Sequence, residues 1–145
     1  MLIAVYGSLR KGFYNHSIIE DSVYLGRFDS LPEYNMYDLG SYPGLTKNGE
    51  TSIVLEVYRV DQKILSNVDR LEGYNILNED RSHYIRNIID TPYGNAYIYI
   101  YAHSVTGYPQ VIEGDWEECS KEKKYNLWKT ILDQKLEADT HLIYH

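Results

Sequence analysis

The most restrictive pattern in the sequence is the alternation AYIYIYA at residues 96–102. Successive side chains of a β-strand point to opposite faces, so Ala and Ile fill one face of this segment and Tyr fills the other. The preceding residues 91–95 (TPYGN) contain Pro, Gly and Asn, which are typical of turns. Residues 84–90 are rich in β-branched and aromatic side chains. The pattern therefore predicts a β-hairpin.

Two further segments favour strands, and one favours a helix. Residues 2–6 form a short apolar run that stops at Gly7, and residues 52–60 (SIVLEVYRV) are rich in β-branched side chains. In residues 62–71 apolar side chains recur every three or four positions, and Asp61 is a suitable N-cap for a helix there. The sequence therefore predicts an α+β fold in which strands dominate.

Two more helical segments are expected. Residues 16–21 can form a short helix capped by Asn15. Residues 121–138 carry an apolar stripe at helical spacing, which consists of Tyr125, Trp128, Ile131, Leu132 and Leu136. We expect one domain over residues 1–145, with residues 119–145 as a C-terminal helical extension.

Composition and charge exclude several classes of protein. With 14 Lys and Arg against 21 Asp and Glu, the net charge of −7 argues against a nucleic-acid surface or a polybasic membrane anchor. The single cysteine, Cys119, rules out an intramolecular disulfide and a cysteine-rich zinc module. No apolar run reaches the ~18 residues of a transmembrane helix. His141 and His145 are four residues apart but lie in the last residues of the sequence, and the other histidines are scattered singly, so no metal site is expected. We expect a soluble, cytoplasmic protein without a metal.

Tyrosine is unusually frequent, with 16 Tyr against 2 Phe. A half-buried sheet surface favours Tyr and would explain most of these residues. Alternatively, some of the phenols line a pocket and form hydrogen bonds with a small polar ligand, because a buried Tyr hydroxyl usually finds a polar partner.

The loop after the first strand, residues 6–12 (YGSLRKG), is one candidate site. Gly7 and Gly12 allow a sharp turn that exposes consecutive N–H groups to an anion. Phe13 and Tyr14 stand where a P-loop has Lys and Ser or Thr, so a nucleotide site is excluded. A tight turn without any ligand is the alternative.

Glu72 is a second candidate. Gly73 is a typical C′ glycine, which places Glu72 at the C-terminal end of the helix over residues 62–71. The unpaired carbonyls there disfavour an ionised carboxylate by ~0.3–1 kcal/mol and raise its pKa, as a general base requires. An exposed glutamate in a salt bridge is the alternative.

These segments occur in an order that is itself informative. They are residues 5–12 (VYGSLRKG) with Asn15, 42–45 (YPGL), 55–58 (LEVY), 68–74 (VDRLEGY), 82–86 (SHYIR), 99–101 (YIY) and 114–116 (GDW). In this order the chain resembles the γ-glutamylcyclotransferase-like family from residue 3 to about residue 118. The segments YGSL and LEG are the most specific parts.

The resemblance implies a fold and an activity. The expected fold is a small mixed β-barrel with flanking helices, and the expected reaction releases 5-oxoproline and a free amine from a γ-glutamyl compound without a cofactor. Glu72 would be the general base and acid. The expected substrate-binding residues are Tyr6, Gly7, Ser8 and Leu9, to which we add Tyr84 and Tyr101 as pocket hydroxyls. A non-catalytic binding or regulatory module with the same anion-holding loop is the alternative, and a homodimer is the assembly considered.

Overall fold

The computed structural model describes the backbone of residues 1–144 and the side chains of residues 1–138. The strands are β1 (Leu2–Val5), β2 (Val23–Asp29), β3 (Tyr34–Asp38), β4 (Pro43–Lys47), β5 (Val54–Arg59), β6 (Tyr84–Thr91) and β7 (Gly94–Tyr101). The α-helices are α1 (Gln62–Leu71) and α2 (Trp116–Tyr144), and two short 3₁₀ turns are η1 (His16–Ile18) and η2 (Glu79–Arg81).

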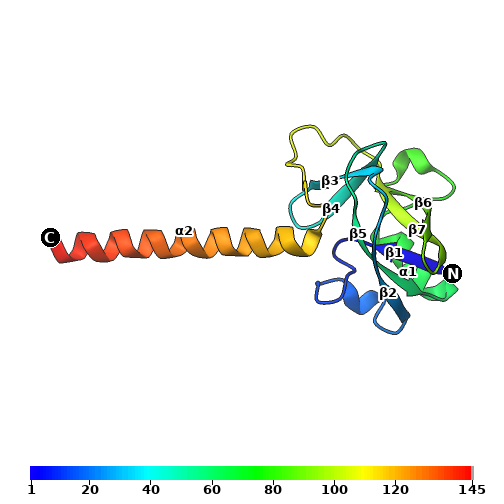
Figure 1. Cartoon of the computed structure of the whole chain (residues 1–145), viewed down its shortest axis with the longest axis horizontal. Helices are drawn as coiled ribbons and strands as arrows, with labels where there is room; N and C mark the ends of the chain where they lie inside the picture. Colours follow the sequence, from blue (N-terminus) through cyan, green and yellow to red (C-terminus); the bar gives the residue numbers. More distant parts are fainter. Residues whose placement is uncertain (145) are drawn as a thin grey trace.

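β1 lies at the centre of a five-stranded mixed sheet with the order β2-β5-β1-β7-β6 (Figure 1). It pairs antiparallel with β5 and parallel with β7, and β7 forms the predicted hairpin with β6. Two residues, Pro92 and Tyr93, join the last hydrogen-bonded pair of that hairpin, Thr91 and Gly94. The expected strands at residues 2–6, 52–60, 84–90 and 96–102 are therefore confirmed, with small shifts at their ends.

Both faces of this sheet are buried. Ala4 on β1 and Ile98 on β7 belong to one apolar cluster, which includes Met36, Leu45 and Leu55. The alternate residues of the same strands, including Ile3, Val5 and Tyr99, face a second cluster to which α1 contributes Leu65 and Val68. The Tyr face of β7 is therefore core surface under α1 and not a solvent-facing surface.

The α+β class is confirmed, but a closed barrel is not. Within residues 1–144, β2 and β6 remain unpaired edges of the sheet, and β3 and β4 form a separate two-stranded ribbon. This ribbon packs against β7: a Cβ on Gly44 would lie 3.0 Å from the Cβ of Tyr101. The ribbon covers the sheet by side-chain packing and does not extend the strand ladder.

The predicted helices differ in outcome. α1 has the predicted bounds, and the Asp61 carboxylate accepts a hydrogen bond from the N–H of Ile64 at 2.8 Å. The prediction of a helix over residues 16–21 is wrong, because only a 3₁₀ turn forms there. Asn15 does not cap it and instead donates to the Ser8 hydroxyl at 3.0 Å.

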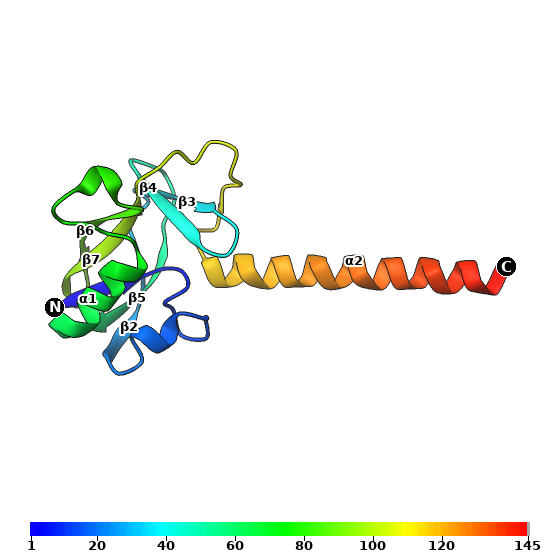
Figure 2. The same ribbon diagram turned by 180° about the vertical axis from the view of Figure 1, so that it is seen from behind.

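The C-terminal helix is confirmed and begins earlier than expected, at Trp116. Asp115 accepts a hydrogen bond from the Glu117 N–H at 3.0 Å, which satisfies one of the unpaired donors at the helix start. Figures 1 and 2 show α2 running away from the rest of the molecule. Part of the expected extension, residues 139–145, lies outside the described side chains.

A buried ion cluster around Arg10 joins three parts of the fold. The Arg10 side chain is 1% exposed and donates to Glu56 on β5 and to Asp115 before α2, both at 2.9 Å. Glu56 also accepts from the N–H of Lys11 at 3.0 Å and from the hydroxyl of Tyr58 at 2.7 Å. Burial acts to raise the pKa of Glu56, but these donors hold it below its ordinary value. The cluster fixes residues 7–12 against the sheet.

We predict that Arg10→Met lowers the free energy of unfolding by about 3–5 kcal/mol, because it leaves two buried carboxylates without their counter-ion. Arg27→Met is the matched control. Arg27 also faces Asp115, at 3.5 Å, but its side chain is 49% exposed, so its loss should cost at most about 1 kcal/mol. Chemical denaturation of the three proteins at pH 7 measures the difference. Equal costs for the two variants would contradict the role of the cluster.

Candidate active site

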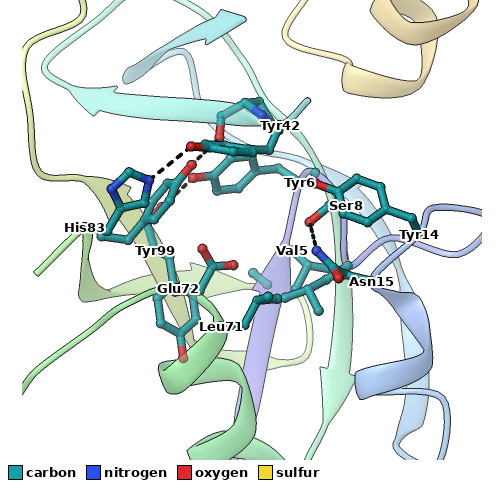
Figure 3. Close-up of a pocket in the computed structure, with 15 residues that line it drawn as sticks. Val5, Tyr6, Ser8, Tyr14, Asn15, Tyr42, Leu71, Glu72, His83 and Tyr99 are labelled. Atoms are coloured by element: carbon teal, nitrogen blue, oxygen red, sulfur yellow. Dashed lines mark hydrogen bonds between the residues drawn. The ribbon is translucent and has the colours of Figure 1, made fainter. Parts of the chain in front are cut away.

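A pocket of about 370 Å³ lies between the loop after β1, the end of α1 and the start of β6. Its lining includes Ala4, Val5, Tyr6, Gly7, Ser8, Leu9, Tyr14, Asn15, Tyr42, Pro43, Leu71, Glu72, His83, Tyr84 and Tyr99. Figure 3 shows the Glu72 carboxylate pointing into the space between these residues, with Ser8 and Asn15 across from it. The two segments singled out in the sequence, YGSL and LEG, therefore meet at one cavity.

The end of α1 holds Glu72 in place. Gly73 has φ +63°, and the N–H groups of Gly73 and Tyr74 donate to the carbonyls of Arg70 and Asp69 at 3.2 and 2.9 Å. This is the Schellman arrangement of a helix end. The Glu72 carbonyl accepts from the Tyr84 N–H at 3.1 Å, which ties the helix end to β6.

The environment of the Glu72 carboxylate favours its neutral form. Burial raises the pKa of Glu72 to about 8, and the nearby negative charge of Asp69 adds to this shift. Within residues 1–138 no group donates a hydrogen bond to this carboxylate. The position of Glu72 at the helix end predicts a raised pKa, but burial, followed by the charge of Asp69, is the larger physical cause.

Asp69 supports the site from behind Glu72. It lies one turn earlier on α1 and accepts from the Tyr99 hydroxyl at 2.6 Å and from Arg86 at 2.7 Å. The Arg86 guanidinium also lies over the ring of Tyr97, 4.3 Å from its centroid. Asp69 is thus an anchored charge beside Glu72.

The loop at residues 7–9 lines the pocket and contains unpaired N–H donors. Its carbonyls are used internally: Gly7 accepts from the Arg10 N–H and Ser8 from the Asn15 N–H, both at 3.0 Å. The N–H groups of Gly7, Ser8 and Leu9 donate to no atom of the described residues. Gly7 permits the close approach of Pro43, whose Cδ would lie 2.6 Å from a Cβ at this position. Such a group of free N–H donors suits a small anion.

Of the three tyrosines expected to contribute hydroxyls to the pocket, two line it and one does not. Tyr6 and Tyr84 line the pocket, and their hydroxyls donate to the carbonyls of Tyr99 and Pro43 at 2.6 and 2.7 Å. These hydroxyls therefore meet a ligand as acceptors. Tyr101 is absent from the lining and packs its ring against Tyr84, 5.4 Å between centroids.

Several side chains that line the pocket were not predicted individually from the sequence. Tyr14, Tyr42 and His83 line the pocket, and the Tyr42 hydroxyl lies 3.3 Å from Nε2 of His83. Burial, with a contribution from His103, lowers the pKa of His83, so its ring is mostly neutral at pH 7. The segments YPGL and SHYIR contain Tyr42 and His83, and their place in the family motifs was the available signal.

The described residues contain neither a metal-binding cluster nor a membrane-spanning helix. Among the described residues, no group of three or more His, Cys, Asp or Glu side chains is arranged to hold a metal ion. Likewise, none of the helices in that part of the chain is long and apolar enough to cross a membrane.

The class of protein follows from comparison with known families. The family model described as "Gamma-glutamyl cyclotransferase, AIG2-like" matches residues 3–118. The chain belongs to this family. A relative from Vibrio cholerae is 43% identical over 115 residues, which cover 79% of this chain and 94% of the relative. The protein YtfP of Escherichia coli K12, named as a gamma-glutamylcyclotransferase family protein, is 37% identical over 121 residues, which cover 83% of this chain and all of YtfP.

Solved structures agree with this assignment. The crystal structure of PH0828 from Pyrococcus horikoshii superposes with a TM-score of 0.70 at 26% identity, covering 86% of this chain and 97% of PH0828. The solution structure of E. coli YtfP gives a TM-score of 0.62 at 36% identity, covering 80% of this chain and 96% of that one. The mixed sheet with its helices is thus the fold of this family.

We predict that Asp69→Asn lowers the pKa of Glu72, because it removes the adjacent negative charge. The pKa should stay above that of an exposed glutamate, since the carboxylate remains buried. A carboxyl ¹³C NMR titration of labelled protein measures the shift. Glu79→Gln, which removes a carboxylate on η2 near Tyr74, is the control and should leave the titration of Glu72 in place. An unchanged Glu72 pKa in Asp69→Asn would overturn the electrostatic role of Asp69.

Proposed function

We propose that the protein cyclises the γ-glutamyl group of a γ-glutamyl amine or amino acid to 5-oxoproline and releases the free amine. One observation carries this proposal. Glu72, a half-buried residue whose carboxylate has a raised pKa and no described hydrogen-bond donor, shares a pocket with three unpaired N–H groups. The family to which the chain belongs supports the reaction type.

Glu72 acts first as a base. The α-amino group of the substrate carries a proton near neutral pH, and α-ammonium groups lose that proton at about pH 8 or above. A carboxylate with a pKa of about 8 is a far stronger base than an exposed glutamate, so its proton affinity is well matched to this ammonium. Glu72 accepts the proton and frees the nitrogen lone pair for attack.

Ring closure then uses atoms of the substrate alone. The α-nitrogen attacks the γ-carbonyl carbon, a new C–N bond closes a five-membered ring, and the carbonyl oxygen becomes an oxyanion. The original C–N amide bond breaks as the oxyanion collapses, and Glu72 gives its proton to the leaving nitrogen. The ring nitrogen, which became positively charged when it attacked, loses its second proton to the regenerated Glu72 carboxylate, and this proton then passes to the released amine. Because nucleophile and electrophile belong to one molecule, the protein mainly has to hold the folded-back conformation.

The loop at residues 7–9 holds the negative end of the substrate. Of the described residues that line the pocket, none is a lysine or arginine. The N–H groups of Gly7, Ser8 and Leu9 are therefore the hydrogen-bond donors in the pocket lining that can bind an anion, and they suit the substrate α-carboxylate. In this proposal the hydroxyl oxygens of Tyr6 and Tyr84, whose protons are donated to backbone carbonyls, accept hydrogen bonds from the α-ammonium.

We predict that Glu72→Gln lowers 5-oxoproline formation by about 10²–10⁴-fold, the usual contribution of a general base. Turnover of the wild type should rise with pH toward about pH 8, as Glu72 ionises. The assay offers γ-glutamyl amino acids, γ-glutamyl amines and glutathione, with Glu79→Gln as the active control. Undiminished turnover in Glu72→Gln would end the case for Glu72 as the base. No product from the wild type would favour a binding module.

The same variant should be more stable at alkaline pH. The folded state raises the pKa of Glu72, so the wild type loses stability as pH rises from the unfolded-state value of about 4.3 toward 8. Gln carries no charge and avoids this loss. The melting temperature of Glu72→Gln should exceed that of the wild type at pH 8, and the difference should vanish near pH 4. A large drop in melting temperature at both pH values would identify Glu72 as a structural ion-pair partner.

We predict that 5-oxoproline or glutamate shifts the backbone amide NMR signals of Gly7, Ser8 and Leu9. Lys11 is the internal control, because its N–H already donates to Glu56 at 3.0 Å and is not free to bind a ligand. Titration of ¹⁵N-labelled protein measures the response at each amide. Saturable shifts confined to another part of the surface would place the ligand elsewhere and contradict the loop assignment.

A further inference from the structure

α2 is an addition to the family domain. The family match ends at residue 118, whereas the helix has 29 residues and spans about 43 Å at 1.5 Å per residue. Its first turns are attached to the domain: Trp116 is buried, and Lys123 bonds to Asp38 and to the carbonyl of Gly40. Every described residue from 121 to 138 is exposed.

An apolar stripe runs along this exposed part of α2. Tyr125, Trp128, Leu132 and Leu136 follow one another at intervals of three or four residues and so lie on one side of the helix. Trp128 is 64% exposed and Leu136 is 63% exposed. Helical stability in water comes mainly from packing of an apolar face, and this face packs against nothing within residues 1–138.

The net charge of α2 limits the kind of partner that its apolar stripe can bind. Residues 117–145 carry five Lys against six Asp and Glu, whereas residues 1–116 carry nine Lys and Arg against fifteen Asp and Glu. Helices that bind anionic lipid or nucleic acid carry an excess of positive charge on their polar face. α2 lacks this excess. Its nearly neutral charge also means that two copies of it do not repel each other.

We propose that the stripe on α2 binds the same stripe on a second copy of this chain, so that the two helices pack side by side in a homodimer. A two-fold pair buries the same patch on both partners and needs no other surface. Tyr125 and Trp128, whose side chains can bury about 150–250 Å² each, together with Ile131, Leu132 and Leu136 supply roughly half of the ~800 Å² per partner of a standard interface. The methylene stems of flanking lysines add further apolar surface.

The test compares two double variants of the full chain with the same change in charge. Leu132→Glu with Leu136→Glu places two charges on the stripe, and Thr130→Glu with Gln134→Glu places them on the opposite side of the helix. Sedimentation equilibrium over a wide concentration range should give twice the 17.0 kDa chain mass for the wild type and for the Thr130/Gln134 control. The Leu132/Leu136 variant should give the chain mass, with a dissociation constant weakened by at least 100-fold.

Trp128 provides a second readout. Its fluorescence should shift to the blue as the wild type is concentrated, because the indole leaves water, while buried Trp116 contributes a constant signal. A wild type that stays monomeric at high concentration would overturn the proposal, whether or not it binds lipid vesicles. A dimer that persists in the Leu132/Leu136 variant would also overturn it, because the contact would then lie elsewhere. Both double variants lie outside the pocket, so these outcomes are independent of the proposed activity.

Discussion

The buried guanidinium of Arg10 connects segments that are far apart in the sequence. One guanidinium joins the loop after β1 to Glu56 on β5 and to Asp115 at the start of α2, with both bonds at 2.9 Å. A buried ion pair of this kind contributes less to net stability than to the choice of one conformation, because desolvation offsets much of the attraction. In this conformation the carbonyls of Gly7 and Ser8 accept from the N–H groups of Arg10 and Asn15, and the N–H groups of residues 7–9 have no acceptor among the described residues.

The site combines a fixed backbone with a glutamate side chain whose ionised form is disfavoured by its surroundings. The Schellman end of α1 and the hydrogen bond from the Tyr84 N–H to the Glu72 carbonyl fix the backbone of Glu72 beside the pocket. Burial and the charge of Asp69 then raise the pKa of Glu72 to about 8, which destabilises the ionised protein. Strongly shifted pKa values in a cavity are typical of functional sites, since a merely structural glutamate would find a counter-ion. Arg86 does not fill that role because it is paired with Asp69.

The chain consists of a region that matches the family model and a helix that continues beyond it. The sheet is buried on both faces, so the domain stabilises itself through two apolar clusters and through the β3–β4 ribbon. α2 is capped and anchored at its start by Asp115 and Trp116, which belong to the family match, and then leaves the domain (Figure 2). Because the pocket lies at the end of α1, a partner bound along α2 would not have to change the chemistry of the site.

Local sequence determined the elements whose signals are contained in a few neighbouring residues. The alternation at residues 96–102, the turn before it, the cap at Asp61 and the glycine at 73 were enough for the β6–β7 hairpin and for α1 with its bounds. The family motifs brought Gly7, Ser8, Leu9 and Glu72 together as a site. Strands β2, β3 and β4 were not predicted. Gly26 interrupts the pattern of β2 and Pro43 and Gly44 that of β4, whereas β3 has few apolar residues and its Met36 is buried by residues distant in the chain. Only the tertiary structure could also decide that Tyr101 lies behind the pocket, that Asn15 bonds to Ser8, and that Asp69 sits between Arg86 and Tyr99. These outcomes depend on distances across the sheet, which no local period encodes.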